Sequence, residues 1–224
     1  MGSLLPALKP FVFTVCLIPA ALLAWNAYVV VRGAGGLTDL GANPIRELEI
    51  RTGLWTIRFL AITLAITPAR QLLGLGALAK YRRMLGLFTF FYACLHMTMF
   101  TAVDWFFDVP AMIDEVFKHK FIFVGMATFL MLMPLALTST NWAVRKLGGA
   151  RWARLHRLVY LIAVTATVHY LWAVKKDTFF PLAYFATFLG LLGYRTVLML
   201  RRRRAGSRAN HGARVVDAGG AATD

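Results

Sequence analysis

Six long apolar stretches restrict this chain to one broad class of fold. They cover residues 11–31, 53–67, 85–103, 121–137, 155–174 and 179–200. A helix needs about 20 apolar residues to cross a bilayer, and a spanning segment must satisfy its own backbone hydrogen bonds. Hydrophobic residues make up 59% of the 224 residues, above the level of a soluble domain. The sequence therefore predicts an all-α membrane protein with six transmembrane helices in a bundle. Its second helix is expected to stop at Pro68.

The charges between these stretches predict the orientation of the bundle. One set of connections holds eight acidic residues and seven basic ones. Connections rich in lysine and arginine stay in the cytoplasm, so both termini are predicted to be cytoplasmic. The net charge of +15 is then a topology signal with contacts to anionic lipid, rather than a sign of nucleic-acid binding. The sixteen positive charges assigned to the cytoplasm are Lys9, Arg70, Lys80, Arg82, Arg83, Arg145, Lys146, Arg151, Arg154, Arg157, Arg201, Arg202, Arg203, Arg204, Arg208 and Arg214.

The remaining segments outside the apolar stretches differ in character. Residues 1–204 are predicted to form one membrane domain, and the polar, glycine-rich residues 205–224 a disordered cytoplasmic tail. The two outer connections, 32–52 and 104–120, have nearly balanced charge and enough length to form a docking surface. Asn43-Pro44 is a turn signal within the first of them.

Histidines inside the apolar stretches are the strongest candidates for function. His156 and His169 lie on one expected helix, 151–174, and their separation along its axis is ~20 Å. His96 lies ~20 Å from Arg83 and His169 lies ~22 Å from Arg154, so these two histidines reach nearly the same depth, toward the outer face. His156 stays at the cytoplasmic edge. Ionisable residues at membrane depth are costly and mark functional sites.

The matched depth of His96 and His169 predicts a pair of axial ligands to one haem. Two imidazoles suit an iron that only passes electrons, because both axial positions are filled by strong ligands. The chain has no C-x-x-C-H attachment site, so the haem is expected to be b-type. The alternatives are histidines that only hydrogen-bond a neighbouring helix, or a metal-ion transport path. On an ideal helix His156 and His169 face different sides, which a local bulge or two differently placed haems would reconcile.

Several arginines are candidates for contacts with anionic groups. Arg58 lies inside the second stretch and either extends toward the interface or pairs with a haem propionate. A cluster at the cytoplasmic edge suits propionates, the phosphate of a flavin mononucleotide or a quinone headgroup, although it also suits lipid phosphates. It surrounds His156, which is expected to mark the point of electron entry. The members of this cluster are Arg82, Arg83, Arg154 and Arg157, with Arg151 beside them.

Three stretches together resemble the ferric-reductase-like transmembrane family. They are TGLWTIRFLAITLAITPAR at 52–70, YRRMLGLFTFFYACLHM at 81–97 and TSTNWAVRKLGGARWARLHRLVYL at 138–161, with His169 following. Within that family they are similar to the haem-binding membrane subunits of bacterial periplasmic methionine sulfoxide reductase systems. The similarity covers roughly residues 10–200.

The resemblance implies a bacterial inner-membrane protein that binds one or two haems b, and a flavin mononucleotide, FMN, is also attributed to such proteins. It implies electrons from the quinone pool or a cytosolic flavin reductase, passed outward to a soluble molybdopterin subunit that carries the catalysis. The family's ligands map onto His96, His156 and His169. The wider family has two histidines on each of two helices, and this chain lacks the fourth, which leaves the inner site without a known second ligand.

Two other functions remain as alternatives. A stand-alone ferric or oxygen reductase normally continues into flavin and nicotinamide domains, whereas about 20 residues follow Arg204 and no G-x-G-x-x-G follows a strand. A non-redox transporter or structural membrane protein is the third alternative. The sequence favours an electron-transfer subunit without substrate chemistry of its own.

Overall fold

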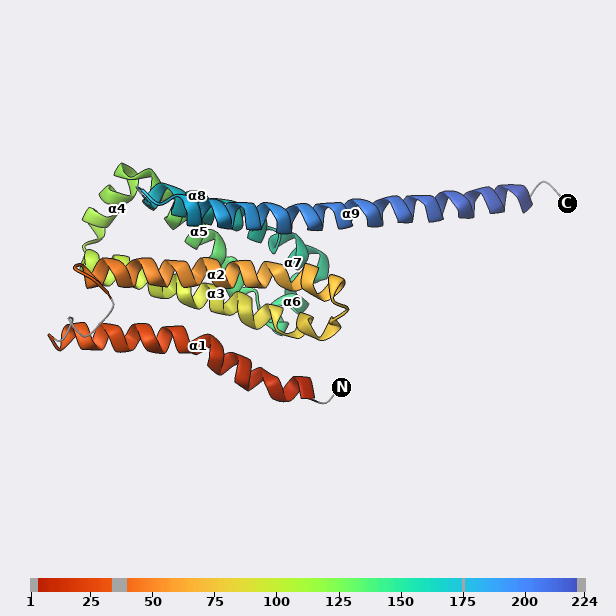
Figure 1. Ribbon diagram of the computed structural model, residues 1–224. Helices are drawn as coiled ribbons and strands as arrows, with labels where there is room; N and C mark the ends of the chain where they lie inside the picture. Colours follow the sequence, from red (N-terminus) through yellow and green to blue (C-terminus); the bar gives the residue numbers. More distant parts are fainter. Residues whose placement is uncertain (1–3, 34–39, 175, 221–224) are drawn as a thin grey trace.

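A computed structural model describes residues 4–33, 40–174 and 176–220 of the chain. All regular structure among these residues is helical, which confirms the predicted all-α class (Figure 1). In chain order the elements are α1 (Leu4–Val31), α2 (Pro44–Leu72), the short 3₁₀ turn η2 (Gly76–Lys80), α3 (Arg82–Thr98), the π-helical turn η3 (Met99–Asp104), α4 (Val109–Lys118), α5 (Lys120–Leu137), α6 (Asn141–Leu147), α7 (Gly149–Leu155), α8 (Leu158–Ala173) and α9 (Phe179–Gly220).

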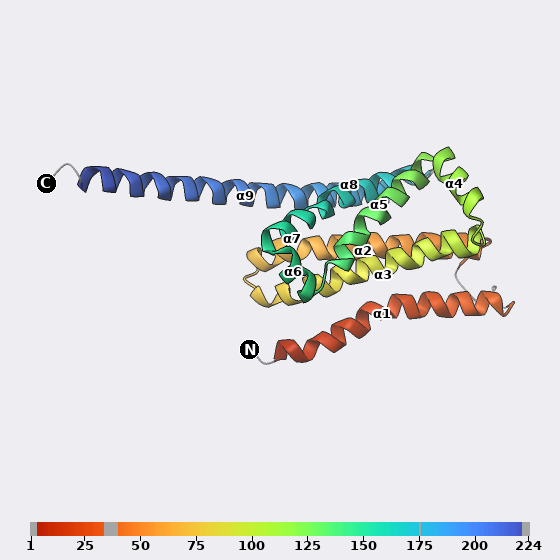
Figure 2. The same ribbon diagram turned by 180° about the vertical axis from the view of Figure 1, so that it is seen from behind.

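Two helical hairpins form the centre of the bundle. α2 packs along α3, and α5 packs along α8, in the two most extensive helix contacts of the fold. α9 lies against α8 and α2, while α1 contacts α2 and α3 from the other side (Figures 1 and 2). Both termini lie at the same end as α6 and α7, here called the inner end, and α4 lies at the opposite, outer end.

Five of the helical segments are long and apolar enough to cross a membrane, in agreement with the predicted membrane protein. They are Leu8–Val31, Pro44–Leu72, Arg82–Asp104, Lys120–Leu137 and Phe179–Arg201. The remaining candidate, α8, has 16 residues and runs between α5 and α9. The total of six spans and the cytoplasmic position of the termini therefore stay predictions.

The second helix is much longer than the sequence predicts. Asn43 caps its N-terminus, because the Asn43 side chain accepts a hydrogen bond from the Arg46 N–H at 3.1 Å, and Pro44 occupies the first turn. The expected outer loop 32–52 is thus wrong for residues 44–52, and Asn43-Pro44 begins a helix rather than a loop turn. Residues 34–39 of that loop lie outside the described part of the chain.

Pro68 does not end this helix either, because another helix replaces the missing hydrogen bond. A proline has no N–H, so the carbonyl of Leu64, four residues earlier, loses its usual donor. Arg195 of α9 supplies one: its Nη2 donates to Leu64 O at 2.9 Å and to Thr67 Oγ1 at 2.9 Å. Within a membrane such an orphaned carbonyl must find a partner inside the protein. Arg195 therefore allows α2 to pass through Pro68 to Leu72.

The expected helix 151–174 is interrupted at its inner end. α7 ends at Leu155 and α8 begins at Leu158, with His156 and Arg157 between them. The backbone N–H groups of Arg157 and Tyr160 bond to carbonyls three residues earlier rather than four, which tightens the chain locally. The prediction of one continuous helix carrying both histidines is therefore wrong, and His169 alone lies in α8.

Helix α1 is held to α3, the helix that carries His96, by Tyr92, which is fully buried. The Tyr92 hydroxyl donates to Cys16 O at 2.8 Å and accepts from Ala20 N–H at 3.0 Å. It thus bridges a carbonyl and an N–H of α1 that would otherwise pair directly, next to Pro19. A side chain inserted in this way bends a helix, and α1 is visibly bent in Figure 1.

Two segments that the sequence predicts to be irregular are helical in the structure. Residues 109–118 of the expected outer connection form α4. α9 continues beyond Arg204 to Gly220, through residues that the composition assigns to a disordered tail, and extends well past the bundle (Figure 1). The division into a domain 1–204 and a disordered segment 205–224 remains a prediction.

The pairing of Pro68 with Arg195 predicts coupled stability effects. Arg195→Met should lower the free energy of unfolding by about 1–3 kcal/mol, because Leu64 O loses its donor. In a Pro68→Ala background the penalty should shrink, because the introduced alanine brings an N–H of its own. Thermal unfolding in detergent of the two single variants and the double variant measures the coupling. Strictly additive effects would show that Arg195 does not serve the proline.

Candidate functional site

A cavity of ≈ 690 Å³ lies between the two hairpins toward the outer end. This volume is within the range of cofactor and ligand sites. Its deep wall is apolar, with Leu60 of α2, Leu132 of α5 and Ile162 of α8, and its lining includes both His96 and His169. Polar residues gather at the outer mouth: Asn43, Arg46, Glu49, Asp104 and Glu115.

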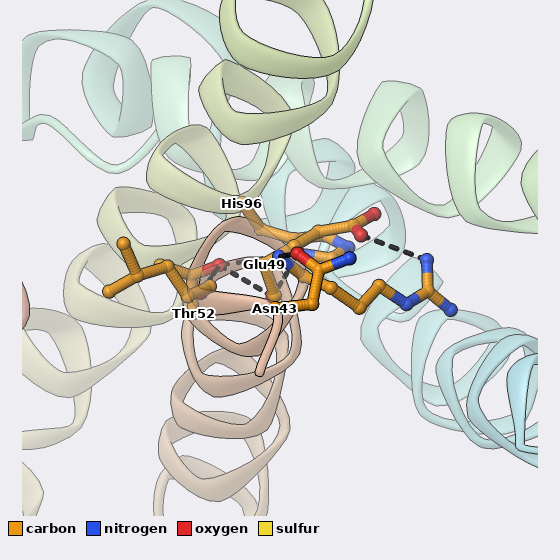
Figure 3. Close-up of polar contacts among 6 residues, drawn as sticks. Asn43, Glu49, Thr52 and His96 are labelled. Atoms are coloured by element: carbon orange, nitrogen blue, oxygen red, sulfur yellow. Dashed lines mark hydrogen bonds and ion pairs between the residues drawn. The ribbon is translucent and has the colours of Figure 1, made fainter. Parts of the chain in front are cut away.

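His96 of α3 is oriented by the backbone of α2. Its Nδ1 lies 2.9 Å from Glu49 O, and the Thr52 hydroxyl approaches the same nitrogen at 3.4 Å (Figure 3). A carbonyl oxygen only accepts, so Nδ1 carries the proton and donates it to Glu49 O. The other ring nitrogen, Nε2, is left with its lone pair.

His169 of α8 is oriented in the same way by the backbone of α5. Its Nδ1 lies 2.7 Å from Phe121 O, so Nδ1 again donates and Nε2 keeps the lone pair. A histidine that binds a metal usually donates its other N–H to a carbonyl or carboxylate, which fixes the tautomer and the ring direction. Both histidines therefore have the arrangement of metal ligands.

The two rings lie opposite each other across the cavity, with ring centres 6.1 Å apart and planes at 70°. A metal–imidazole bond is about 2 Å, so two imidazoles on opposite sides of one metal place their ring centres roughly 6 Å apart. The observed separation fits such a bridge. The structure thus brings together the two residues that the depth estimate pairs, although ligation itself is still a prediction.

The apolar walls and the two nitrogen donors suit a haem rather than a bare ion. Among the residues that the structure describes, no group of three or more His, Cys, Asp or Glu side chains is arranged around a metal position. Two axial imidazoles are sufficient for a metal that brings its own equatorial ligands. The polar mouth, with Arg46, offers a place for the acidic edge of such a group.

His156 lies at the inner end, far along the bundle from this cavity. Its ring stacks on Trp152, with ring centres 3.9 Å apart. Its Nε2 lies 3.1 Å from Thr138 Oγ1, and that hydroxyl already donates to Pro134 O at 2.6 Å, so Nε2 is the donor. His156 could ligate through Nε2 only after leaving Thr138. In this arrangement Nε2 of His156 is engaged with Thr138, and the second haem and the His156 ligand role remain predictions.

The predicted arginine contacts divide into different settings. Arg58 lies over the Trp55 ring at 4.6 Å, and Arg83 donates to Asn141 Oδ1 at 2.6 Å. Arg154 and Arg157 are exposed beside the break between α7 and α8. Arg82 lines a second, inner cavity of ≈ 450 Å³. The anionic partners proposed for these five arginines are still untested.

Several residues of the two cavities are missing from the sequence-based set. Arg195 lines the inner cavity with Arg82 and Tyr160, although it lies within an apolar stretch, where an isolated arginine is itself a signal. Arg46 and Glu49, 3.0 Å apart as an ion pair, belong to the outer mouth. The sequence analysis did not include them, because the charged residues in the first turns of α2 were expected to form the loop 32–52 between two helices.

The chain is similar to known proteins over most of its length. A family profile described as "Ferric reductase like transmembrane component" matches residues 52–167. A relative from Rhodospirillum rubrum is 48% identical over 196 residues, covering 87% of this chain and 90% of the relative. One from Xanthomonas euvesicatoria pv. vesicatoria is 44% identical over 202 residues, covering 90% and 91%. A comparison with solved structures found no match.

Both of these relatives are named "Protein-methionine-sulfoxide reductase heme-binding subunit MsrQ", and so is a third, from Herminiimonas arsenicoxydans, which is 48% identical over 191 residues, or 84% of this chain and 83% of its own. The matched region contains α3 and α5 and most of α2 and α8, the four helices around the outer cavity. The chain therefore belongs to the ferric-reductase-like transmembrane family, and within it to the MsrQ proteins.

Proposed function

We propose that the protein is the membrane electron-transfer subunit of a methionine sulfoxide reductase system and holds a haem b between His96 and His169. One observation carries this proposal: two imidazoles whose ring centres are 6.1 Å apart, each with Nδ1 committed to a backbone carbonyl. The names of the relatives support the haem and the reductase system.

A haem held by His96 and His169 would supply a one-electron carrier. The residues of the chain do the rest. α2 and α5 hold the two imidazoles in one tautomer, and the apolar walls of the cavity exclude water. Arg46 lies at the outer mouth with Nη1 3.0 Å from Glu49, and the other N–H groups of its guanidinium would donate to a haem propionate there.

The electron acceptor is proposed to be a periplasmic MsrP-like molybdopterin subunit, which carries out the reduction of methionine sulfoxide in oxidised periplasmic proteins. The lining of the cavity supports outward transfer, because it includes Glu115 of α4, the helix at the outer end. Glu115 of α4 and Asp104 of η3 both line the outer mouth. A partner bound to α4 would therefore stand close to the histidine pair.

The electron donor is proposed to act at the inner end, which the positive-inside rule places in the cytoplasm. Either the quinone pool or a cytosolic flavin reductase would serve, and FMN is a further proposed cofactor. The inner cavity combines the guanidinium groups of Arg82 and Arg195 with the Tyr160 hydroxyl, groups that bind a phosphate or a quinone oxygen. His156, Arg83, Arg154 and Arg157 lie at the same end of the bundle.

The paired ligands predict that either histidine is essential for the outer haem. His96→Ala or His169→Ala should abolish the low-spin b-type absorption bands, while the protein still inserts in the membrane. His119→Ala is the matched control, because His119 lies at the outer end, is half-exposed and pairs with Glu115 at 3.1 Å. Absorption spectra of purified, haem-reconstituted variants measure this. A full low-spin spectrum in both variants would refute the pairing.

The proposed entry site predicts a separate effect for His156. His156→Ala should block reduction by quinol or reduced flavin and leave the outer haem bound. Chemical reduction of the same preparation with dithionite is the control, since it reports the haem without the entry site. Stopped-flow absorption measures both rates. If every physiological donor still reduces the variant at the wild-type rate, electrons enter elsewhere.

The outward direction predicts where the partner docks. In a background without Cys16 and Cys94, a probe at Asp114→Cys on α4 should crosslink to the purified molybdopterin subunit. Asp114 is well exposed, with 61% of its side chain accessible. A probe at Lys146→Cys on α6, at the inner end, is the control and should give no adduct. Adducts confined to the inner probe would reverse the proposed direction.

A further inference from the structure

The two histidines form the same kind of hydrogen bond with their neighbouring helices. His96 donates to the carbonyl of Glu49, and the residue four positions later in α2 is Gly53. His169 donates to the carbonyl of Phe121, and the residue four positions later in α5 is Gly125. In an α-helix the carbonyl of residue i points toward residue i+4. A donor from outside that reaches this carbonyl must therefore pass over residue i+4.

The distances show that a side chain at Gly125 would collide with the His169 ring and that one at Gly53 would crowd the His96 ring. A Cβ built on Gly125 would lie 2.7 Å from both Cε1 and Nδ1 of His169. A Cβ on Gly53 would lie 3.2 Å from Cε1 and 3.3 Å from Nδ1 of His96. The first contact is shorter than packed atoms tolerate, and the second is tight. Both glycines are within regular helices, where glycine is otherwise unfavourable by roughly 1 kcal/mol relative to alanine.

The other helical glycines whose surroundings the structure describes lack this relation. A Cβ on Gly86 of α3 would meet the Thr63 side chain at an ordinary 3.7 Å, and Gly190 and Gly193 of α9 have nothing within 4 Å. The close approach thus belongs to the two glycines beside the histidine rings. Each is also followed three residues later by a threonine, Thr56 or Thr128, whose hydroxyl bonds back to its own helix.

We propose that Gly53 and Gly125 are positioning residues for the two axial ligands. Each glycine forms a notch through which the imidazole Nδ1–H reaches the helix carbonyl, so that the ring direction and the tautomer are fixed before any metal binds. The inference rests on the proposed binding of one haem by His96 and His169. It adds that the two glycines set the direction of those histidine rings. A methyl group in either notch would push the ring away from the carbonyl and misdirect Nε2.

The two notches are not equally strict. Gly125 has the shorter distances, and among the described residues the Phe121 carbonyl is the hydrogen-bond acceptor that α5 offers to His169 Nδ1. On the other side, the Thr52 hydroxyl also approaches His96 Nδ1, so a displaced His96 ring has a second acceptor within reach. We therefore expect Gly125→Ala to be more damaging than Gly53→Ala.

The first test measures the bound haem rather than turnover. Gly125→Ala should lose most of the haem, and Gly53→Ala should keep more of it but shift the low-spin electron paramagnetic resonance signature and the midpoint potential. Gly190→Ala is the control and should match the wild type. If both notch variants match Gly190→Ala in haem content, resonance signature and potential, the inference is wrong. If the wild type itself shows no bis-imidazole signature, the proposed function fails instead.

The second test separates the ring contact from a general packing role and needs no haem. In the apo-protein, Gly125→Ala should lower the unfolding temperature when His169 is present. In a His169→Ala background the same change should be neutral or stabilising, because the ring is gone and alanine favours the helix. The pair Gly53→Ala and His96→Ala should behave likewise. Equal losses with and without the histidine would overturn the notch, since the glycine would then serve some other contact.

Discussion

The hydrogen bond from an imidazole N–H to a helix carbonyl is the interaction on which the arrangement depends. It occurs twice, at Glu49 O and at Phe121 O, and it leaves each ring with one free nitrogen. In a bilayer a polar side chain that finds no partner is costly, so a histidine there adopts whichever geometry satisfies it. Here that geometry also places the two rings 6.1 Å apart, as the proposed ligand pair requires. The same bond therefore lowers the cost of burying the histidines and prepares the site.

The need to satisfy polar groups away from water also shapes the scaffold. Arg195 donates a hydrogen bond to the Leu64 carbonyl, which Pro68 leaves without a donor. The Tyr92 hydroxyl bridges the Cys16 carbonyl and the Ala20 N–H of α1, beside Pro19. Each contact joins two helices that are distant in sequence. In both places a side chain from another helix binds backbone groups close to a proline within an apolar bundle. These contacts fix how α9 and α1 lie against the central hairpins.

Much of the fold and the main site could be predicted because both depend on length and depth. Apolar runs specify helices, and counting from Arg83 and Arg154 places His96 and His169 at one level, even though a break at His156 separates α7 from α8. The break could not be predicted, because residues 155–158 contain no glycine or proline. The start of α2 was hidden because its first turns carry Arg46, Glu47 and Arg51, and the 2.8 Å ion pair of Arg51 with Glu47 forms only once the helix exists. Which glycines face the rings depends on helix rotation, although the repeated Gly-x-x-Thr of α2 and α5 offers a hint.

Each histidine is bound inside its own hairpin, His96 by α2 against α3 and His169 by α5 against α8. The protein contacts that orient the rings therefore do not cross from one hairpin to the other, and helix packing between the hairpins is sparser than within them. A metal held by both rings would be the cross-link at that level of the bundle, much as a disulfide joins two separately folded segments. Assembly would then have an order: two preformed halves come first, and closure around the cofactor joins them. The cavity between the hairpins is the place where such a cross-link would join them.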